Sequence, residues 1–149
     1  MAMTRGMAFT AANEGKRLLP YKDSLGVLTI GYGHNLNFPI SDAAAEQIFS
    51  DDYNEKTREA WASAWWPKVV DDAPRSIALI DFIYQLSEKK FENEFPHAFA
   101  AAVAGDWLTC ADQLQWTDAA KTVPSRWFAE CPNRAAKVLT ILRTGQMEG

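Results

Sequence analysis

The sequence predicts an α+β protein that is mostly helical, with a small β-hairpin N-terminal lobe and a larger helical C-terminal lobe joined by a long helix. Three observations predict it: a turn flanked by β-forming residues between 18 and 32, a long alanine-rich segment after residue 41, and apolar residues at helical spacing through most of the remainder. We expect a single domain over residues 1–149. The N-terminal lobe would cover about 15–52, and the helical lobe about 67–149 plus the N-terminal helix.

The first elements are a short helix and a small sheet. Residues 4–14 are expected to form the helix, because Gly15 follows where a left-handed C-cap residue is favoured. The run Asp23-Ser24-Leu25-Gly26 has Asp at the first and Gly at the fourth position of a type I turn, and β-forming residues follow it. We therefore expect a hairpin or a three-stranded sheet over residues 18–32.

Helices are expected from residue 41 onward. Ser41 is a good N-cap for a long helix that runs to about Trp66, where Pro67 would stop it. Pro74 opens the segment SIALIDFIYQL, which is apolar nearly all round and is expected to be the central buried helix. Further helices are expected at about 95–104, 106–115, 124–130 and 133–143, separated by Gly105, Pro124 and Pro132.

Composition excludes several classes of protein. The chain is 48% hydrophobic and 23% charged, which is typical of a packed globule, and its net charge of -4 argues against a nucleic-acid binder. No window is apolar enough to span a membrane, so we expect no stable membrane insertion. The only histidines are His34 and His97, no HExxH motif occurs, and the two cysteines are not spaced as in a CxxC motif. We therefore expect no zinc site.

Two acids in the run EGKRLLPYKDSLGVLTIGYGH, residues 14–34, are candidates for acid–base chemistry. Glycoside hydrolysis needs one carboxyl group that stays protonated and one that stays ionised. Glu14 ends a helix, where the dipole disfavours its charged form, and apolar neighbours such as Phe9, Leu18 and Leu19 would add a desolvation penalty. Asp23 opens a turn whose N–H groups can hold a carboxylate ionised. Local backbone chemistry alone would also explain both residues.

This run resembles the signature of phage lysozymes, the endolysins of glycoside hydrolase family 24. Eight residues separate Glu14 from Asp23, and five separate Asp23 from Thr29, as in that family. The similarity continues through FIYQL at 82–86, AGDW at 104–107, RWFAECPNRA at 126–135 and RTG at 143–145. The resemblance covers most of the chain and implies a lysozyme-like fold.

The resemblance also implies an activity. It implies cleavage of the β-1,4 bond between N-acetylmuramic acid and N-acetylglucosamine in the glycan strand of peptidoglycan, with no metal and no cofactor. Glu14 would be the general acid, Asp23 would activate or position water, and Thr29 would hold that water. We further expect a monomer that acts as an endolysin: it would accumulate in the host cytoplasm and reach the periplasm or cell wall through a holin-type pore.

Several residues are candidates for supporting roles. The resemblance implies that Arg134 pairs with Glu14, and Asn133 beside it is a further supporting candidate. A solvated surface arginine is the alternative. Gln85 and Trp127 correspond to a pair in the wall of the family's cleft, and an indole face could pack against a sugar ring.

The glycines and the histidine at the end of the motif have two possible roles. Gly31 and Gly33 would free space beside Thr29 for a sugar or water, although glycine in a β segment can equally mark a bulge. His34 is expected to be a structural hydrogen-bonding residue that ties down the sheet rather than a proton carrier.

Three other functions compete with hydrolysis of the glycan. A lytic transglycosylase would need the acid but no water-activating Asp23. A wall-binding or structural protein could keep the fold without the chemistry. An amidase or peptidase could use Cys110 or Cys131 with His34 or His97, but no motif arranges them as such.

Overall fold

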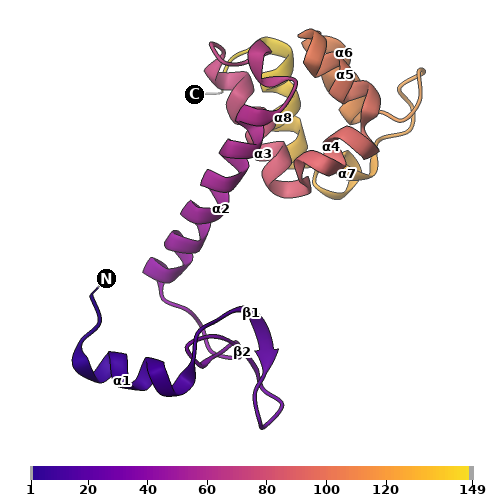
Figure 1. Cartoon of the computed structure of the whole chain (residues 1–149). Helices are drawn as coiled ribbons and strands as arrows, with labels where there is room; N and C mark the ends of the chain where they lie inside the picture. The colour runs from indigo at the N-terminus through magenta and orange to yellow at the C-terminus, as the bar shows by residue number, and fades with distance from the viewer. Residues whose placement is uncertain (1, 148–149) are drawn as a thin grey trace. The chain divides into compact units, whose positions relative to one another are not determined.

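A computed structural model describes residues 2–147 of the chain (Figure 1). It is mostly helical with one small antiparallel sheet, which confirms the predicted α+β class. The chain divides into two compact units, Met1–Gln47 and Ile48–Gly149. The first contains the sheet and the N-terminal helix, and the second contains most of the helices.

The N-terminal unit begins with helix α1 (Arg5–Glu14). The Thr4 hydroxyl accepts a hydrogen bond from the Met7 backbone N–H, which caps the start of the helix. Gly15 follows with a φ of 72°, and its N–H donates to the Ala11 carbonyl. This helix ends as predicted, which places Glu14 in its last position.

Three short strands form the sheet: β1 (Arg17–Lys22), β2 (Leu28–Gly31) and β3 (His34–Asn35). Their order is β1-β2-β3, and both pairs are antiparallel. Tyr21 is opposite Thr29 and Ile30 is opposite His34, with a bulge between Arg17 and Tyr21. The predicted turn is present, since the Gly26 N–H donates to the Asp23 carbonyl at 3.0 Å.

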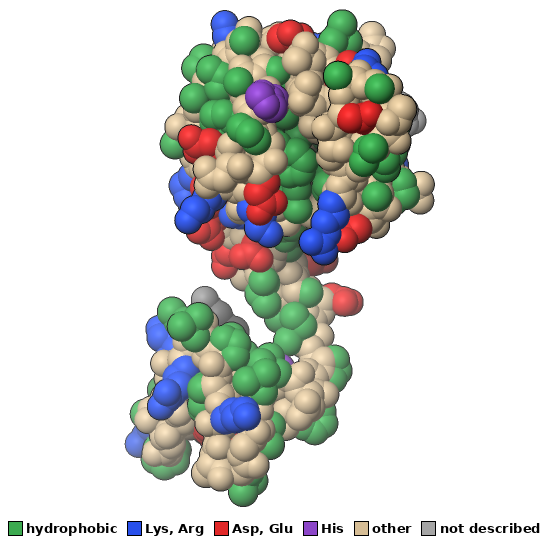
Figure 2. All heavy atoms as spheres, turned by 90° about the vertical axis from the view of Figure 1, so that its right-hand side faces the viewer, with side chains coloured by type: hydrophobic (Ala, Val, Ile, Leu, Met, Phe, Trp, Pro, Cys, Tyr) green, Lys and Arg blue, Asp and Glu red, His purple; other side chains and the backbone are tan. Residues whose placement is uncertain are grey.

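Few side chains of the N-terminal unit are buried. Among its described residues only Thr29 is fully buried, at 4% exposure. Phe9, Leu18 and Leu19 are each more than 70% exposed. Apolar side chains and Lys or Arg side chains lie next to one another on the face of this unit seen in Figure 2, where it is the smaller body. Backbone hydrogen bonds, more than an apolar core, therefore define the sheet.

Helix α2 (Asp42–Ala62) is the long helix that the sequence predicts. The Ser41 hydroxyl accepts a hydrogen bond from the Ala44 N–H, as expected of an N-cap. The predicted end near Trp66 is wrong, because the chain changes to i→i+3 hydrogen bonds after Ala62 and continues into the 3-10 helix η1 (Trp66–Lys68). This tight turn brings Trp65 into the core, where it is fully buried.

The helical unit is built around α3 (Ala73–Leu86), which starts at the predicted proline and is the central buried helix. Figure 1 shows it beside α8 (Pro132–Thr144), and these two helices pack together. Around them lie α5 (Pro96–Ala104), α6 (Trp107–Gln115) and α7 (Arg126–Glu130). The buried residues of α3 are Ala78, Leu79, Ile80, Phe82 and Ile83.

One helix is missing from the sequence prediction: α4 (Glu88–Glu94). Only Phe91 in it is fully buried, so its sequence shows no apolar stripe. Ser87 has a φ of 90° and caps the helix by accepting a hydrogen bond from the Lys90 N–H. The side chain of Glu88 accepts hydrogen bonds from the Ser63 hydroxyl and the Trp65 indole N–H, which ties α4 to the end of α2.

The half-buried Glu88 should make stability depend on pH. Burial raises the pKa of Glu88 above its ordinary value of 4.5, the charges of Glu59 and Glu92 add to the rise, and the hydrogen bonds from Ser63 and Trp65 oppose it. The unfolded carboxyl group thus ionises at lower pH than the folded one, so stability is lost as pH rises from about 4.5 through the folded pKa. In urea unfolding, the change in stability between pH 4 and pH 7 should be less favourable for the wild-type protein than for Glu88→Gln, because only the wild type carries this loss. Parallel pH profiles for the two proteins would contradict it.

No described helix combines the length and apolar character needed to cross a membrane.

Candidate active site

The Glu14 carboxylate lies against the sheet of the N-terminal unit. A methyl group built on Gly33 would come within 2.6 Å of Glu14 Oε2 and 3.1 Å of its Cδ. Gly33 lies in the turn between β2 and β3, immediately before His34. The Glu14 carboxylate, at the end of α1, therefore lies beside this turn. Phe9, Leu18 and Leu19 are too exposed to form the predicted apolar surround of this side chain, because the unit has almost no core to hold them.

Asp23 is held by its own turn, as predicted. Its Oδ1 accepts hydrogen bonds from the backbone N–H groups of Leu25 and Val27, both at 2.8 Å. Its backbone N–H in turn donates to the Val27 carbonyl at 2.9 Å. These two donors fix the orientation of the carboxyl group, and they leave Oδ2 with no hydrogen-bond partner inside the described part of the chain.

Thr29 lies in β2, opposite Tyr21 of β1. Its hydroxyl donates to the Val27 carbonyl at 2.9 Å. Val27 also contacts Asp23, since its N–H donates to Asp23 Oδ1 and its carbonyl accepts from the Asp23 N–H. Because the hydroxyl proton is used in this way, the Thr29 oxygen retains lone pairs that can accept a hydrogen bond from water. The expected role of Thr29 in holding water stays a prediction.

The structure also brings Gly31 and His34 into this unit. Gly31 has a φ of 69° and open space where a side chain would lie, as expected of a glycine that lets a ligand approach the backbone. His34 pairs with Ile30 in the sheet. Its Nε2 atom is buried and has no hydrogen-bond partner among the described residues, so its predicted structural hydrogen bond is not made there.

Gly33→Ala should impair activity by displacing Glu14. The new methyl group would overlap the Glu14 carboxylate, and an alanine at a φ of 77° costs about 1–2 kcal/mol in strain. A displaced catalytic group can cost about 100-fold in rate, so we expect a loss of about that size in the turnover of solubilised peptidoglycan.

Gly26→Ala is the matched control, because Gly26 also has a φ of 77° but has nothing within 4 Å of the added methyl group. This variant carries the same backbone strain without the overlap. Equal losses of activity in the two variants would show that strain, and not the position of Glu14, is responsible.

A second group of predicted residues lies in the helical unit. Arg134, in the first turn of α8, is held by Asp81 of α3: Nε donates to Oδ2 at 2.9 Å and Nη2 donates to Oδ1 at 2.8 Å. This hydrogen-bonded pair raises the pKa of the guanidinium. The alternative of a merely solvated arginine is therefore wrong, while the pairing of Arg134 with Glu14 stays a prediction. Asn133 precedes Arg134 and is exposed.

Gln85 and Trp127 are directly linked. The Trp127 indole N–H donates to Gln85 Oε1 at 3.0 Å, and Gln85 Nε2 lies 3.4 Å from the Cys131 sulfur. Trp127 is only 4% exposed and packs edge-to-face on Phe82 at 4.9 Å. Its ring therefore offers no free face to a sugar, because the core already covers it. Its contribution is to orient Gln85, which lines a pocket of about 370 Å³.

Sequence reasoning missed Asp81, whose role is visible only once α3 and α8 are packed together. Its single signal is an acid within the otherwise apolar run of residues 77–84, where a partner of opposite charge is expected. Cys131 is a free, half-buried cysteine, and its thiol donates a hydrogen bond to the Trp127 carbonyl. In residues 2–147 no three His, Cys, Asp or Glu side chains are grouped so as to hold a metal ion.

Comparison with known proteins gives two findings. A family model described as phage lysozyme matches residues 11–126, which include Glu14, Asp23, Thr29 and Gln85. A probable T4-type lysozyme from Dictyostelium discoideum is 23% identical over 165 residues, and the alignment covers 91% of this chain and 91% of that relative.

Proposed function

The chain belongs to the phage lysozyme family, and from this premise we propose that it hydrolyses the β-1,4 bond between N-acetylmuramic acid and N-acetylglucosamine in bacterial peptidoglycan. Family membership and the similarity to a T4-type lysozyme support a lysozyme-type muramidase in general. We propose the particular bond that is cleaved and the role of each residue in its cleavage.

One observation carries the proposal: a single small unit presents two carboxyl groups in contrasting surroundings. Glu14 lies at a helix C-terminus, and its carboxyl group makes no hydrogen bond in the described chain. Asp23 Oδ1 accepts two backbone N–H hydrogen bonds, which orient the carboxyl group, while its Oδ2 accepts none from the described residues. One group is thus available to donate a proton to a glycosidic oxygen, and the other has an oxygen available to accept a proton from water, which are the two roles that hydrolysis requires.

In the proposed reaction Glu14 donates its proton to the glycosidic oxygen as the bond to the leaving sugar breaks. Asp23 accepts a proton from a water molecule through its free oxygen Oδ2, and the water attacks the anomeric carbon. Thr29 accepts a hydrogen bond from that water. Arg134, Asn133 and Gln85 act as supporting residues in the helical unit, while Gly31 leaves room for the glycan.

We further propose that the protein is an endolysin that causes lysis of its host. It would act as a monomer, accumulate in the host cytoplasm and reach the periplasm or cell wall through a holin-type pore. Expression in a bacterium with and without a pore-forming protein tests this role. Rapid lysis is expected only when both proteins are present, and equally rapid lysis without the pore would contradict the proposed route.

Analysis of the ends of digested peptidoglycan tests the reaction. Purified sacculi treated with the wild-type protein should yield fragments with new reducing N-acetylmuramic acid ends by mass spectrometry. Anhydro-muramic ends would instead identify a lytic transglycosylase, and released amino groups without new sugar ends would identify an amidase or peptidase. Either result would overturn the proposal.

A further inference from the structure

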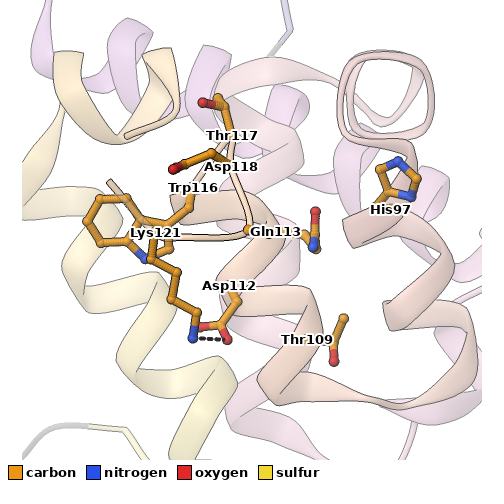
Figure 3. A pocket seen from close by; sticks show the side chains of 9 residues that line it. His97, Thr109, Asp112, Gln113, Trp116, Thr117, Asp118 and Lys121 are labelled. Carbon is orange, nitrogen blue, oxygen red and sulfur yellow. Dashed lines mark hydrogen bonds and ion pairs between the residues drawn. The ribbon is translucent and has the colours of Figure 1, made fainter. Parts of the chain in front are cut away.

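A pocket of about 480 Å³ opens on the surface of the helical unit (Figure 3). It is formed by the start of α5, the exposed side of α6 and the loop that follows α6. All of these belong to one unit, so the shape of the pocket does not depend on the unit that carries the acids. The side chains that line the pocket include His97, Asp112, Gln113, Trp116, Asp118 and Lys121.

The loop over residues 116–125 is a fixed wall. Trp116 pairs with Pro124 in an isolated antiparallel bridge, and the Thr117 N–H donates to the Val123 carbonyl at 2.9 Å. The buried Ser125 hydroxyl donates to the Leu114 carbonyl at 2.6 Å, which ties the end of the loop to α6. A pocket with such a wall is largely formed before a ligand arrives, which lowers the entropic cost of binding.

The charged side chains of the pocket stabilise this wall through ion pairs and hydrogen bonds. Asp112 accepts hydrogen bonds from Lys121 at 2.8 Å and from Arg143 of α8 at 2.9 Å. The hydrogen bond from Lys121 is the main cause that lowers the pKa of Asp112.

The Asp118 side chain also stabilises the loop. Its carboxylate accepts hydrogen bonds from the backbone N–H groups of Thr122 and Val123, at 2.9 and 2.8 Å. A charged ligand would have to break these pairs, because every charged group named here already has a partner. The pocket is therefore poorly suited to a phosphate, a metal ion or a charged peptide.

The groups left for a ligand are neutral or aromatic. In residues 2–147 neither the Gln113 amide nor the His97 imidazole makes a hydrogen bond, and both side chains are exposed at the pocket. Figure 3 shows Gln113 between His97 and the loop. Trp116 is half-buried, and its ring packs on Phe128 with centroids 6.1 Å apart, which fixes the indole at the wall. An amide, an imidazole and an anchored indole suit a ligand that has hydroxyl and amide groups around an apolar ring face.

We propose that this pocket binds an N-acetylhexosamine unit of a glycan strand, in addition to the binding needed for hydrolysis. The inference rests on the proposed function for the identity of the glycan, since peptidoglycan strands consist of such sugars. The Gln113 amide would exchange hydrogen bonds with the acetamido group, and His97 and the Trp116 indole would contact the ring. Such a site would retain the protein on an insoluble wall between cleavage events.

The test uses the full chain carrying Glu14→Gln, so that binding is measured without hydrolysis. Tetra-N-acetylchitotetraose, an uncharged oligosaccharide, is titrated while the backbone amide resonances are followed by NMR. We expect the amides of His97, Gln113 and Trp116 to shift in a saturable way. Adding Gln113→Ala should weaken the affinity measured at these resonances about three- to tenfold, the effect of losing about one net hydrogen bond.

Gln146→Ala is the matched control, since Gln146 is also exposed but does not line the pocket. It should leave the affinity at these resonances unchanged. The inference is overturned if the three amides do not shift with the oligosaccharide, or if Gln113→Ala has no more effect than Gln146→Ala. It is also overturned if the tripeptide L-alanyl-γ-D-glutamyl-meso-diaminopimelate shifts them and the oligosaccharide does not. The digest by the wild-type protein separately reports on hydrolysis.

Discussion

Glu14→Gln should abolish the hydrolysis of peptidoglycan while leaving the protein folded. Glutamine keeps the shape of the side chain but cannot donate the proton that the leaving oxygen needs, and a general acid typically contributes about 100- to 10,000-fold to the rate. The fold should tolerate the change, because Glu14 is exposed and its carboxylate makes no hydrogen bond in the described chain. Clearing of a sacculus suspension measures the rate, and circular dichroism measures folding.

Glu46→Gln is the matched control, because Glu46 is an exposed acidic residue on α2 that belongs to the same unit as Glu14. It makes the same chemical change away from the sheet and should keep the wild-type rate. A folded Glu14→Gln protein that still cleaves at the wild-type rate would remove the acid from the mechanism. It would also revive the rival view that the protein only binds the wall.

Leu114→Ala should be the most destabilising of the substitutions considered. Leu114 on α6 is fully buried in the core of the helical unit. Truncation removes its apolar contacts and leaves a cavity, which costs about 2–5 kcal/mol in the free energy of unfolding. Denaturant unfolding followed by the fluorescence of the buried Trp65 and Trp127 reports on this unit.

The same helix provides the matched control for this substitution. Leu108 also lies on α6 but is 63% exposed, so Leu108→Ala deletes the same atoms from the surface. We expect a change within about 0.5 kcal/mol. If the two variants lost similar stability, helix propensity rather than core packing would be the cause.

Local sequence patterns predicted most elements of the fold. The turn at Asp23 and the caps at Ser41 and Gly15 were predictable because each depends on hydrogen bonds between residues a few positions apart. Helix α3 was predictable because its apolar residues face neighbours on nearly every side. Helix α4 was missed because only Phe91 in it is fully buried, so no apolar stripe marks it. The end of α2 was misplaced because the burial of Trp65 in the core depends on tertiary packing.

The candidate site was predictable to a similar extent. The spacing of Glu14, Asp23 and Thr29 singled them out, and the structure places all three in one unit. The sequence did not reveal that Gly33 contacts Glu14, because α1 and the β2–β3 turn must first be folded together. It also assigned Trp127 a free face, whereas packing on Phe82 buries that ring.

The sequence by itself determined most of the helices and the turn and singled out the candidate acids, since these features depend on residues close together along the chain. Only the tertiary structure decided that Asp81 holds Arg134, that the Trp65 indole donates to Glu88, and that Lys121 pairs with Asp112 at a surface pocket. The partners in these pairs are separated by between 9 and 53 positions. Each pair depends on how the folded elements pack in space, and no local pattern along the chain records that packing.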